Sequence, residues 1–153
     1  MHYYCSKESG RGVDKTALTS IQPPHTDNIF SGRKRVEWRT KPMPEGKHYC
    51  YETKNGGGCG MVIGEYTVSN VKRFDTVHEI SETYISLGCV PRDFLVAYSR
   101  GRALYAHLIL FPRRYAQPVE ISTFSKYGFE NRIPLTRPPQ SWCYVYKTKG
   151  DNK

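Results

Sequence analysis

The chain has 153 residues, a length typical of one domain and too short to divide into two separate cores. Apolar residues make up 38 % and charged residues 24 % of it, a composition that excludes a wholly disordered chain. The net charge is +9, from 23 Lys and Arg against 14 Asp and Glu. Such an excess attracts polyanions such as nucleic acid, although the same excess also serves solubility alone.

Local composition disfavours two further classes of protein. No stretch reaches the run of about 18 apolar residues that a membrane helix needs, and the N-terminal segment lacks the apolar centre of a signal peptide. The five cysteines are an odd number without a close paired spacing, which is typical of reduced thiols. We therefore expect a soluble, cytoplasmic protein that makes no membrane contact.

The two ends of the chain differ from its middle. Residues 1–16 and 149–153 are polar and show no apolar period, so we predict flexible tails there. The remaining residues, 17–148, contain no internal repeat and are predicted to form a single domain.

A short helix and a charged strand are the first elements predicted in this domain. Residues 17–21 are an apolar segment, and prolines before a run that ends in glycine predict a helix from about His25 to Ser31. Residues 34–40 alternate apolar and charged side chains, the pattern of a half-buried strand. Its polar face carries Glu37 and Arg39.

Two strands and two helices are predicted next. Residues 47–54 and 60–74 are rich in β-branched and tyrosine residues on either side of a glycine loop, which predicts two strands. Thr76 has the spacing of a capping box with Glu79, and apolar residues follow at helical spacing up to Gly88. Pro91 opens a further helix that Gly101 can end.

The last predicted elements are strands. Residues 102–111 look covered on both faces, which predicts the centre of the sheet. Residues 119–121 and 142–146 predict two short strands separated by a proline-rich loop. The total is an α+β fold, a curved or barrel-like sheet of about five to six strands with about three peripheral helices.

The segment 32–39 carries the most chemical information, because it packs four cations, one carboxylate and one tryptophan. Lys34 lies between two arginines, and like charges with partial burial would lower its pKa towards the range of a base or nucleophile. The alternative is a solvated strand start in which Glu37 merely pairs with a neighbouring arginine.

A family resemblance extends over about residues 17–146. The string Ser20-Ile21-Gln22-Pro23, followed by the helix and by Gly32-x-Lys34-x-x-Glu37-x-Arg39, resembles the signature of the ASCH domain family in the PUA-like superfamily. Tyr51-Glu52-Thr53 with Val62-Ile63-Gly64-Glu65 resembles the strand pair after the signature, and Arg137 to Trp142 resembles the start of the last strand. The resemblance implies a PUA-like β-barrel with a ligand cleft, in a superfamily associated with RNA binding and RNA modification.

The resemblance implies that Lys34, Glu37 and Arg39 line this cleft. Lys34 and Arg39 suit phosphate or base oxygens, and Glu37 suits the amino groups of a base. The predicted nucleic-acid contacts are Arg33, Lys34, Glu37, Trp38, Arg39, Tyr51, Lys72 and Arg73, the aromatic residues as stacking partners and the outer cations as phosphate contacts. Core packing for the aromatic residues and plain surface charge for the cations are the structural alternatives.

An enzyme is the competing hypothesis. One subgroup of the family resembles an amidohydrolase that removes acetyl from acetylated cytidine, but it has threonine where this chain has Glu37. Other members are reported as ribonucleases, and Lys34 with Tyr51, Tyr98 or Ser141 would supply the acid, base and phosphate clamp of such an enzyme, with Lys34 and Glu37 at its centre. Ordinary packing of Tyr98 and a plain loop hydroxyl at Ser141 are the alternatives.

No cofactor and no metal is predicted. His48, Cys50 and Cys59 come close in sequence, but without a Cys-x-x-Cys pair they are a weak zinc signal. The leading hypothesis is an RNA- or nucleotide-binding module with single-stranded RNA or a modified nucleotide as partner and DNA as the second choice. A scaffold for protein contacts is a third reading, and the sequence leaves the oligomeric state open.

Overall fold

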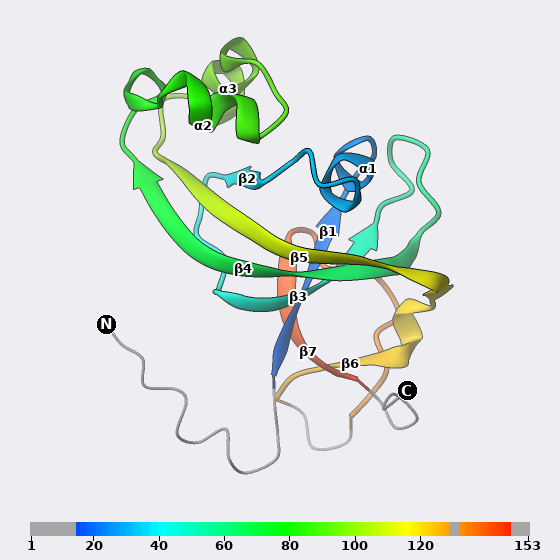
Figure 1. Ribbon diagram of the computed structural model, residues 1–153. Coiled ribbons are helices and arrows are strands. Elements are labelled where there is room, and N and C mark those ends of the chain that lie inside the picture. The colour runs from blue at the N-terminus through cyan, green and yellow to red at the C-terminus, as the bar shows by residue number, and fades with distance from the viewer. Residues whose placement is uncertain (1–14, 129–131, 148–153) are drawn as a thin grey trace.

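The computed structural model describes residues 15–128 and 132–147, which form one mixed sheet with helices packed on it (Figure 1). The strands are β1 (Thr16–Ile21), β2 (Val36–Arg39), β3 (Gly46–Glu52), β4 (Met61–Phe74), β5 (Leu104–Val119), β6 (Phe124–Lys126) and β7 (Trp142–Lys147). The helices are α1 (His25–Phe30), α2 (Glu82–Leu87) and α3 (Arg92–Ser99), with 3₁₀ turns at Val77–Glu79 and Ile121–Thr123. The predicted tails lie outside the described residues except for Lys15 and Thr16.

The sheet has the strand order β2-β5-β4-β3-β1-β7-β6. Only the pair β1–β3 is parallel among these neighbours. The predicted α+β class is confirmed, but within the described residues the sheet is not closed, because β2 and β6 are its edges. It has seven strands: β1 and the three-residue β6 were not predicted as strands. The separate strand predicted at residues 119–121 is wrong, because β5 runs on to Val119 and a 3₁₀ turn begins at Ile121.

Strand β5 is longer and lies nearer the edge than predicted. Both faces of its first half are covered, as expected, yet the strand lies between β2 and β4, second in the order. The prediction that it forms the centre of the sheet is wrong, because helices cover this end of the sheet. The strand also continues through two prolines to Val119, where register shifts against β4 accommodate it.

The helix predicted from the capping box is divided. A 3₁₀ turn covers Val77–Glu79, and the carboxylate of Glu79 accepts a hydrogen bond from the Asp75 backbone N–H instead of one from Thr76. Ser81 is the actual cap of α2, since its hydroxyl accepts a hydrogen bond from the Tyr84 backbone N–H at 3.2 Å. The apolar spacing continues across the break because both pieces pack on the same end of the sheet.

The helices lie at different places along the sheet. Figure 1 shows α2 and α3 together at one end of the long β4–β5 ribbon and α1 farther along it. Gly64 allows α1 to approach closely, because a Cβ there would lie 2.7 Å from the Phe30 ring and 2.5 Å from the Arg113 carbonyl oxygen. Residues of α1, β2 and α3 therefore surround a common region.

Candidate functional site

A cleft of about 320 Å³ opens among α1, β2 and α3, at the lower end of the size range of small-ligand sites. Its charged and titratable lining residues are His25, Lys34, Glu37 and Arg39. Its other lining residues are Ser20, Ile21, Gln22, Trp38, Thr53, Asn55, Val90, Phe94, Tyr98 and Gln140. Residues of the sequence signature, of α3 and of the loop after β3 therefore line the same cleft.

The floor of the cleft is a buried charge cluster formed by Lys34, Glu37 and Arg39. The Lys34 Nζ lies 3.5 Å from one carboxylate oxygen of Glu37, and the Arg39 Nε donates to the other at 2.8 Å. Lys34 is only 3 % and Glu37 only 8 % exposed. Burial of charges is costly, so a cluster that opens into a cleft is a candidate for ligand recognition.

The turn after α1 directs Lys34 into this cluster. Gly32 has a φ of +87°, and the Lys34 backbone N–H then donates to the Asn28 carbonyl at 2.9 Å. The Lys34 ammonium donates to the Gly88 carbonyl at 2.7 Å, whereas Arg33 and Arg35 are exposed. The two arginines that flank Lys34 in the sequence therefore do not share its buried position, and Arg39 is the cation that meets the same carboxylate as Lys34.

Glu37 is ionised at neutral pH. Burial alone would raise the pKa of its carboxyl group, but the charges of Lys34 and Arg39 and the hydrogen bond from Arg39 outweigh burial and lower the pKa to about 2. A carboxylate with so low a pKa is a good hydrogen-bond acceptor and a weak general base.

Arg39 connects the cleft floor to two other strands. Its Nη1 donates to the Ser141 Oγ at 2.9 Å, and its Nη2 donates to the Ser20 carbonyl at 3.2 Å. Ser141 therefore lies beside the cleft through Arg39, although it is not among the lining residues.

An aromatic wall stands beside the charged floor. Phe94 and Tyr98 of α3 both line the cleft, and their rings stack with centroids 5.8 Å apart and an interplanar angle of 12°. Phe94 is 45 % exposed, an unusual position for a large apolar ring unless a partner covers it. Tyr98 was a predicted site residue, whereas Phe94 was predicted only as part of the helix.

His25 is a cleft residue that the sequence analysis did not select. Its Nδ1 is buried and has no hydrogen-bond partner among the described residues. Burial and then the charge of Lys34 lower its pKa below the usual 6.5, so the ring is neutral at pH 7. The signal available in the sequence was its position, directly after the Ser20–Pro23 part of the signature.

Solved structures with the same architecture come from Zymomonas mobilis. The ASCH protein of that organism is 23 % identical in sequence. The match covers 87 % of this chain and 89 % of the Zymomonas mobilis chain, with a TM-score of 0.67. The chain has the ASCH fold. Two further structures are mutants of the same protein, ZmASCH, and each is 22 % identical to this chain. The match to the Tyr-to-Phe mutant covers 88 % of this chain and 92 % of the mutant, with a TM-score of 0.66. The match to the Ser-to-Ala mutant covers 87 % and 89 %, with a TM-score of 0.67. No family model matches the sequence, and no curated protein matches it.

Two aromatic residues predicted as stacking partners are buried in the core of this ASCH fold. Trp38 contributes to the cleft lining but is only 5 % exposed, and its ring packs 5.8 Å from Phe74 and 6.4 Å from Tyr84. Tyr51 lies in a different core cluster with Leu18. We therefore withdraw a stacking role for both, because their rings are occupied by the core.

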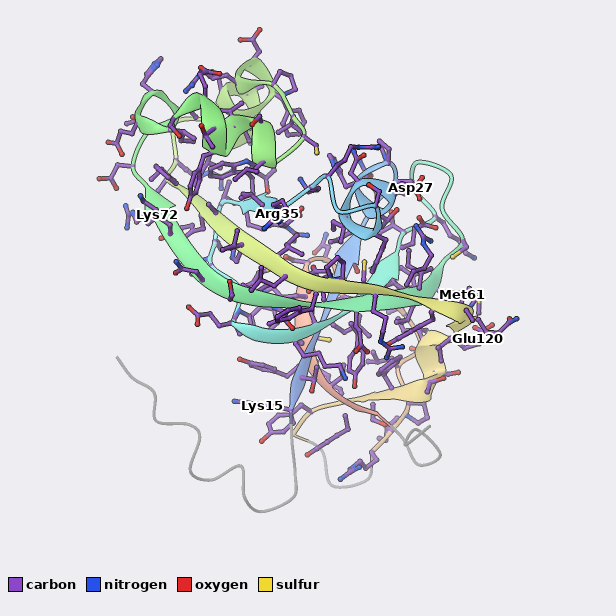
Figure 2. All side chains as sticks on the ribbon, viewed as in Figure 1. Lys15, Asp27, Arg35, Met61, Lys72 and Glu120 are labelled. Carbon is purple, nitrogen blue, oxygen red and sulfur yellow. The ribbon has the colours of Figure 1, made fainter. Side chains whose placement is uncertain are left out.

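Three predicted cations also lie outside the cleft lining of the ASCH fold. Lys72 is near the end of β4 that approaches α2, as Figure 2 shows, with its ammonium 5.1 Å from the Phe74 ring. Arg73 pairs with Asp75 at 3.0 Å, and Arg33 donates to the Asn28 side chain at 2.6 Å. Any RNA contact of these residues remains a prediction.

The weak zinc signal corresponds to no cluster in the part of the chain that the structure describes, where no group of three or more His, Cys, Asp and Glu residues is placed to hold a metal. The His48 ring nitrogens lie 2.6 Å from the Thr19 Oγ1 and 2.8 Å from the Pro44 carbonyl. Over the same described residues, no helix has the length and apolar character needed to cross a membrane.

Proposed function

We propose that the protein binds RNA and holds one nucleotide in the cleft. The observation that carries this proposal is the charged floor of Lys34, Glu37 and Arg39 directly beside the aromatic wall of Phe94 and Tyr98. The wall offers a face for a base to stack on. The cations suit phosphate oxygens, and the Glu37 carboxylate suits an amino group on a base edge.

The charge balance of the floor favours an anionic ligand. Two cations face one carboxylate, and His25 beside them is neutral at pH 7. One positive charge therefore stays uncompensated in a largely buried place, where electrostatic attraction is strong. A nucleotide with its phosphate balances this charge, whereas a neutral nucleoside does not.

The polar side chains that line the cleft favour RNA over DNA as the ligand. Gln22, Thr53, Asn55 and Gln140 line the cleft with amide and hydroxyl groups. Such groups both donate and accept hydrogen bonds, as the ribose 2′-hydroxyl does.

The proposal is tested by binding of labelled single-stranded RNA, with DNA of the same sequence alongside. Phe94→Ala removes the exposed half of the wall, and we expect affinity for RNA to fall roughly tenfold, the effect of losing one stacked base. Val96→Ala is the matched control, since Val96 is 49 % exposed on the same helix but does not line the cleft. Equal affinities of both variants and the unmodified protein would contradict the proposal.

A hydrolase is the second candidate, and His25 is the observation that favours it. A neutral imidazole beside Lys34 and Arg39 can take a proton from water or from a ribose hydroxyl, while the two cations stabilise developing negative charge. Glu37, the base considered from the sequence, is the weaker choice because its pKa is about 2.

Product formation separates the two candidates. Purified protein is incubated with labelled RNA and with acetylated cytidine, and His25→Ala and Lys34→Met serve as controls. Product that disappears in both variants establishes the enzyme, with His25 and Lys34 in its machinery. Salt-sensitive binding without product supports the binding module.

A further inference from the structure

A strip of aromatic rings lies outside the cleft on β7 and just after β6. Trp142, Tyr144 and Tyr146 alternate along β7, and Tyr127 follows β6. The ring centroids are 5.0 Å apart for Trp142–Tyr144, 6.2 Å for Tyr144–Tyr127 and 5.0 Å for Tyr127–Tyr146. All four side chains are partly exposed. We call these four residues the β7 strip.

The β7 strip lies on the surface side of β7. Successive side chains of a strand point to opposite faces, and the intervening Cys143 and Val145 pack into the core with Leu18 and Phe124. The rings at the alternate positions are therefore not needed to fill that core.

Cations accompany the rings of the β7 strip. The Lys15 ammonium lies 4.5 Å from the Tyr144 ring centroid and 5.5 Å from that of Tyr127. The Arg132 guanidinium lies 3.9 Å from the Tyr146 ring centroid. Both cations are exposed, and neither β6 nor β7 contains an Asp or Glu. The strip is an aromatic and positively charged surface, the combination that binds single-stranded nucleic acid.

The β7 strip begins at the cleft. Ser141, which accepts a hydrogen bond from Arg39 of the cleft floor, immediately precedes Trp142. Ile21, at one end of β1, lines the cleft, and Lys15 lies at the opposite end of that strand (Figure 2). Since β1 pairs with β7, the strip extends from the cleft along the neighbouring strand.

We infer that the β7 strip binds the continuation of a single-stranded RNA whose one nucleotide occupies the cleft. This inference rests on the proposed function and extends it from one nucleotide to a short segment. Aromatic residues on strands stack two or three bases in other RNA-binding sheets, and Trp142 to Tyr146 spans roughly 13 Å at the usual rise of a strand. A second copy of the chain is the poorer partner, because two surfaces of like charge repel each other.

A length series tests the inference. Affinity is measured for a ribodinucleotide and for single-stranded RNA of about six nucleotides, a length that reaches past the cleft onto two or three further stacking positions. We expect the longer RNA to bind at least about tenfold more tightly. Trp142→Ala and Tyr144→Ala should each remove most of this gain and leave dinucleotide binding unchanged.

Matched controls distinguish the strip from general effects. Tyr105→Ala removes a partly exposed tyrosine on β5, and Lys47→Ala removes a cation that lies 4.9 Å from the Tyr49 ring on another strand. Both should keep the full gain with length. Lys15→Glu tests the strip without touching the core, because Lys15 is exposed, and should lose the gain even if the aromatic variants fold poorly.

Trp142 supplies an independent readout, since the chain has only two tryptophans and Trp38 is buried. Longer RNA should quench tryptophan emission more than the dinucleotide does, and Trp142→Phe should abolish this additional quenching, because Trp38 lines the cleft that both ligands occupy.

The outcomes separate the two proposals. If the dinucleotide binds but extra length gives no gain, or the gain survives both Tyr144→Ala and Lys15→Glu, the strip inference is overturned and the cleft proposal stands. If the dinucleotide fails to bind, the cleft proposal fails, and the inference fails with it. A concentration-dependent dimer that Tyr144→Ala dissociates, without a length gain, identifies the strip as a contact between copies and also overturns the inference.

Discussion

Glu37 combines two properties that are seldom found together in a carboxyl group. It is almost fully buried, yet it is ionised because Lys34 and Arg39 both contact it. The buried Lys34, the partly buried Arg39 and the carboxylate between them fix one another's side chains in a single arrangement before any ligand arrives. A ligand that meets a preorganised site loses less free energy to ordering it.

The loss of folding stability at acid pH should depend on Glu37. Its pKa is about 2 in the folded protein against 4.5 ordinarily, so its stabilising contribution is complete above pH 4.5 and is lost as the pH falls towards 2. The shift corresponds to about 3 kcal/mol. Urea denaturation should show the unmodified protein more stable than Glu37→Gln at pH 7, with the difference shrinking through this window. A difference that stays constant down to pH 3 would rule out this role.

The ring of His25 should titrate below its usual pKa of 6.5. Burial is the main cause and the charge of Lys34 the next. Lys34→Met removes that charge but keeps a side chain of similar length, so the pKa of His25 should move upward. An NMR titration of the ring protons measures both values. An unchanged pKa in Lys34→Met would show that His25 does not sense the charge cluster.

Sequence reasoning recovered the residues of the site that are local in sequence. Lys34, Glu37 and Arg39 stand within six positions. The strand period places Glu37 and Arg39 on one face, whereas Lys34, an odd number of positions away, was predicted to join them only through the family resemblance. Phe94 lines the same cleft from α3. Because it is far from Lys34, Glu37 and Arg39 in the sequence, no local sequence pattern could predict that it lies beside them. Trp38 was assigned both to the inner face of β2 and to base stacking, and the inner face is where the structure places it.

At the scale of elements, the end of α2 positions the cleft floor. The Gly88 carbonyl accepts from Lys34, and the missing side chain of Gly88 lets that backbone approach Trp38. A Cβ at Gly88 would lie 2.4 Å from the Trp38 Nε1, within a buried cluster that has little room to relax. One glycine therefore links helix packing to the charge cluster.

Gly88→Ala should destabilise the protein by about 1–3 kcal/mol through overpacking and weaken RNA binding by displacing the partner of Lys34. The φ of Gly88 is −92°, so backbone strain does not contribute. Chemical denaturation measures the effect. Trp38→Phe, which removes the indole atoms closest to the new methyl group, is the control background. Gly88→Ala should cost less there, and equal costs in both backgrounds would contradict the steric explanation.

Helices and strands were predicted where the apolar residues repeat over a long segment. They were missed where pairing with another strand, rather than the local sequence, determines that the element forms. Strand β4 has fourteen residues and was found within one residue of its true start. The three-residue β6 exists because it pairs with β7, and no three residues show a period. Thr76 and Ser81 both offer a helix cap, and packing against the sheet rather than the capping pattern selects Ser81.

At the scale of the whole molecule, the distribution of the net charge of +9 bears on the proposed RNA binding. Many cations are engaged locally: Lys47 and Arg113 pair with Glu65, and Arg114 pairs with Asp27. The net charge already counts these carboxylates, so the pairing changes where the positive charge lies on the molecule and not its total. Among the described residues, the cations of the cleft floor and of the β7 strip lie along β1 and β7.

Salt dependence measures this distribution. Each phosphate contact with single-stranded nucleic acid contributes about −0.7 to the slope of log affinity against log salt concentration. Lys15→Gln should reduce the magnitude of the slope for the longer RNA by about that amount, and Lys47→Gln should leave it unchanged because Lys47 is paired with Glu65. Equal slopes for all three proteins would place the RNA away from the β7 strip.

The position of β1 between β3 and β7 has a consequence for how the protein matures on the ribosome. Thr16 pairs with Val145, and the Ser20 backbone N–H donates to the Ser141 carbonyl at 3.0 Å. The ribosome adds about 5–20 residues per second. Until β7 has emerged from it, the edge of β1 that pairs with β7 has no partner strand. That exposed edge is a template for wrong pairing, and Arg39 lacks its partner Ser141 during the same interval. The nascent chain thus gains protection from aggregation and a complete binding cleft in the same late step.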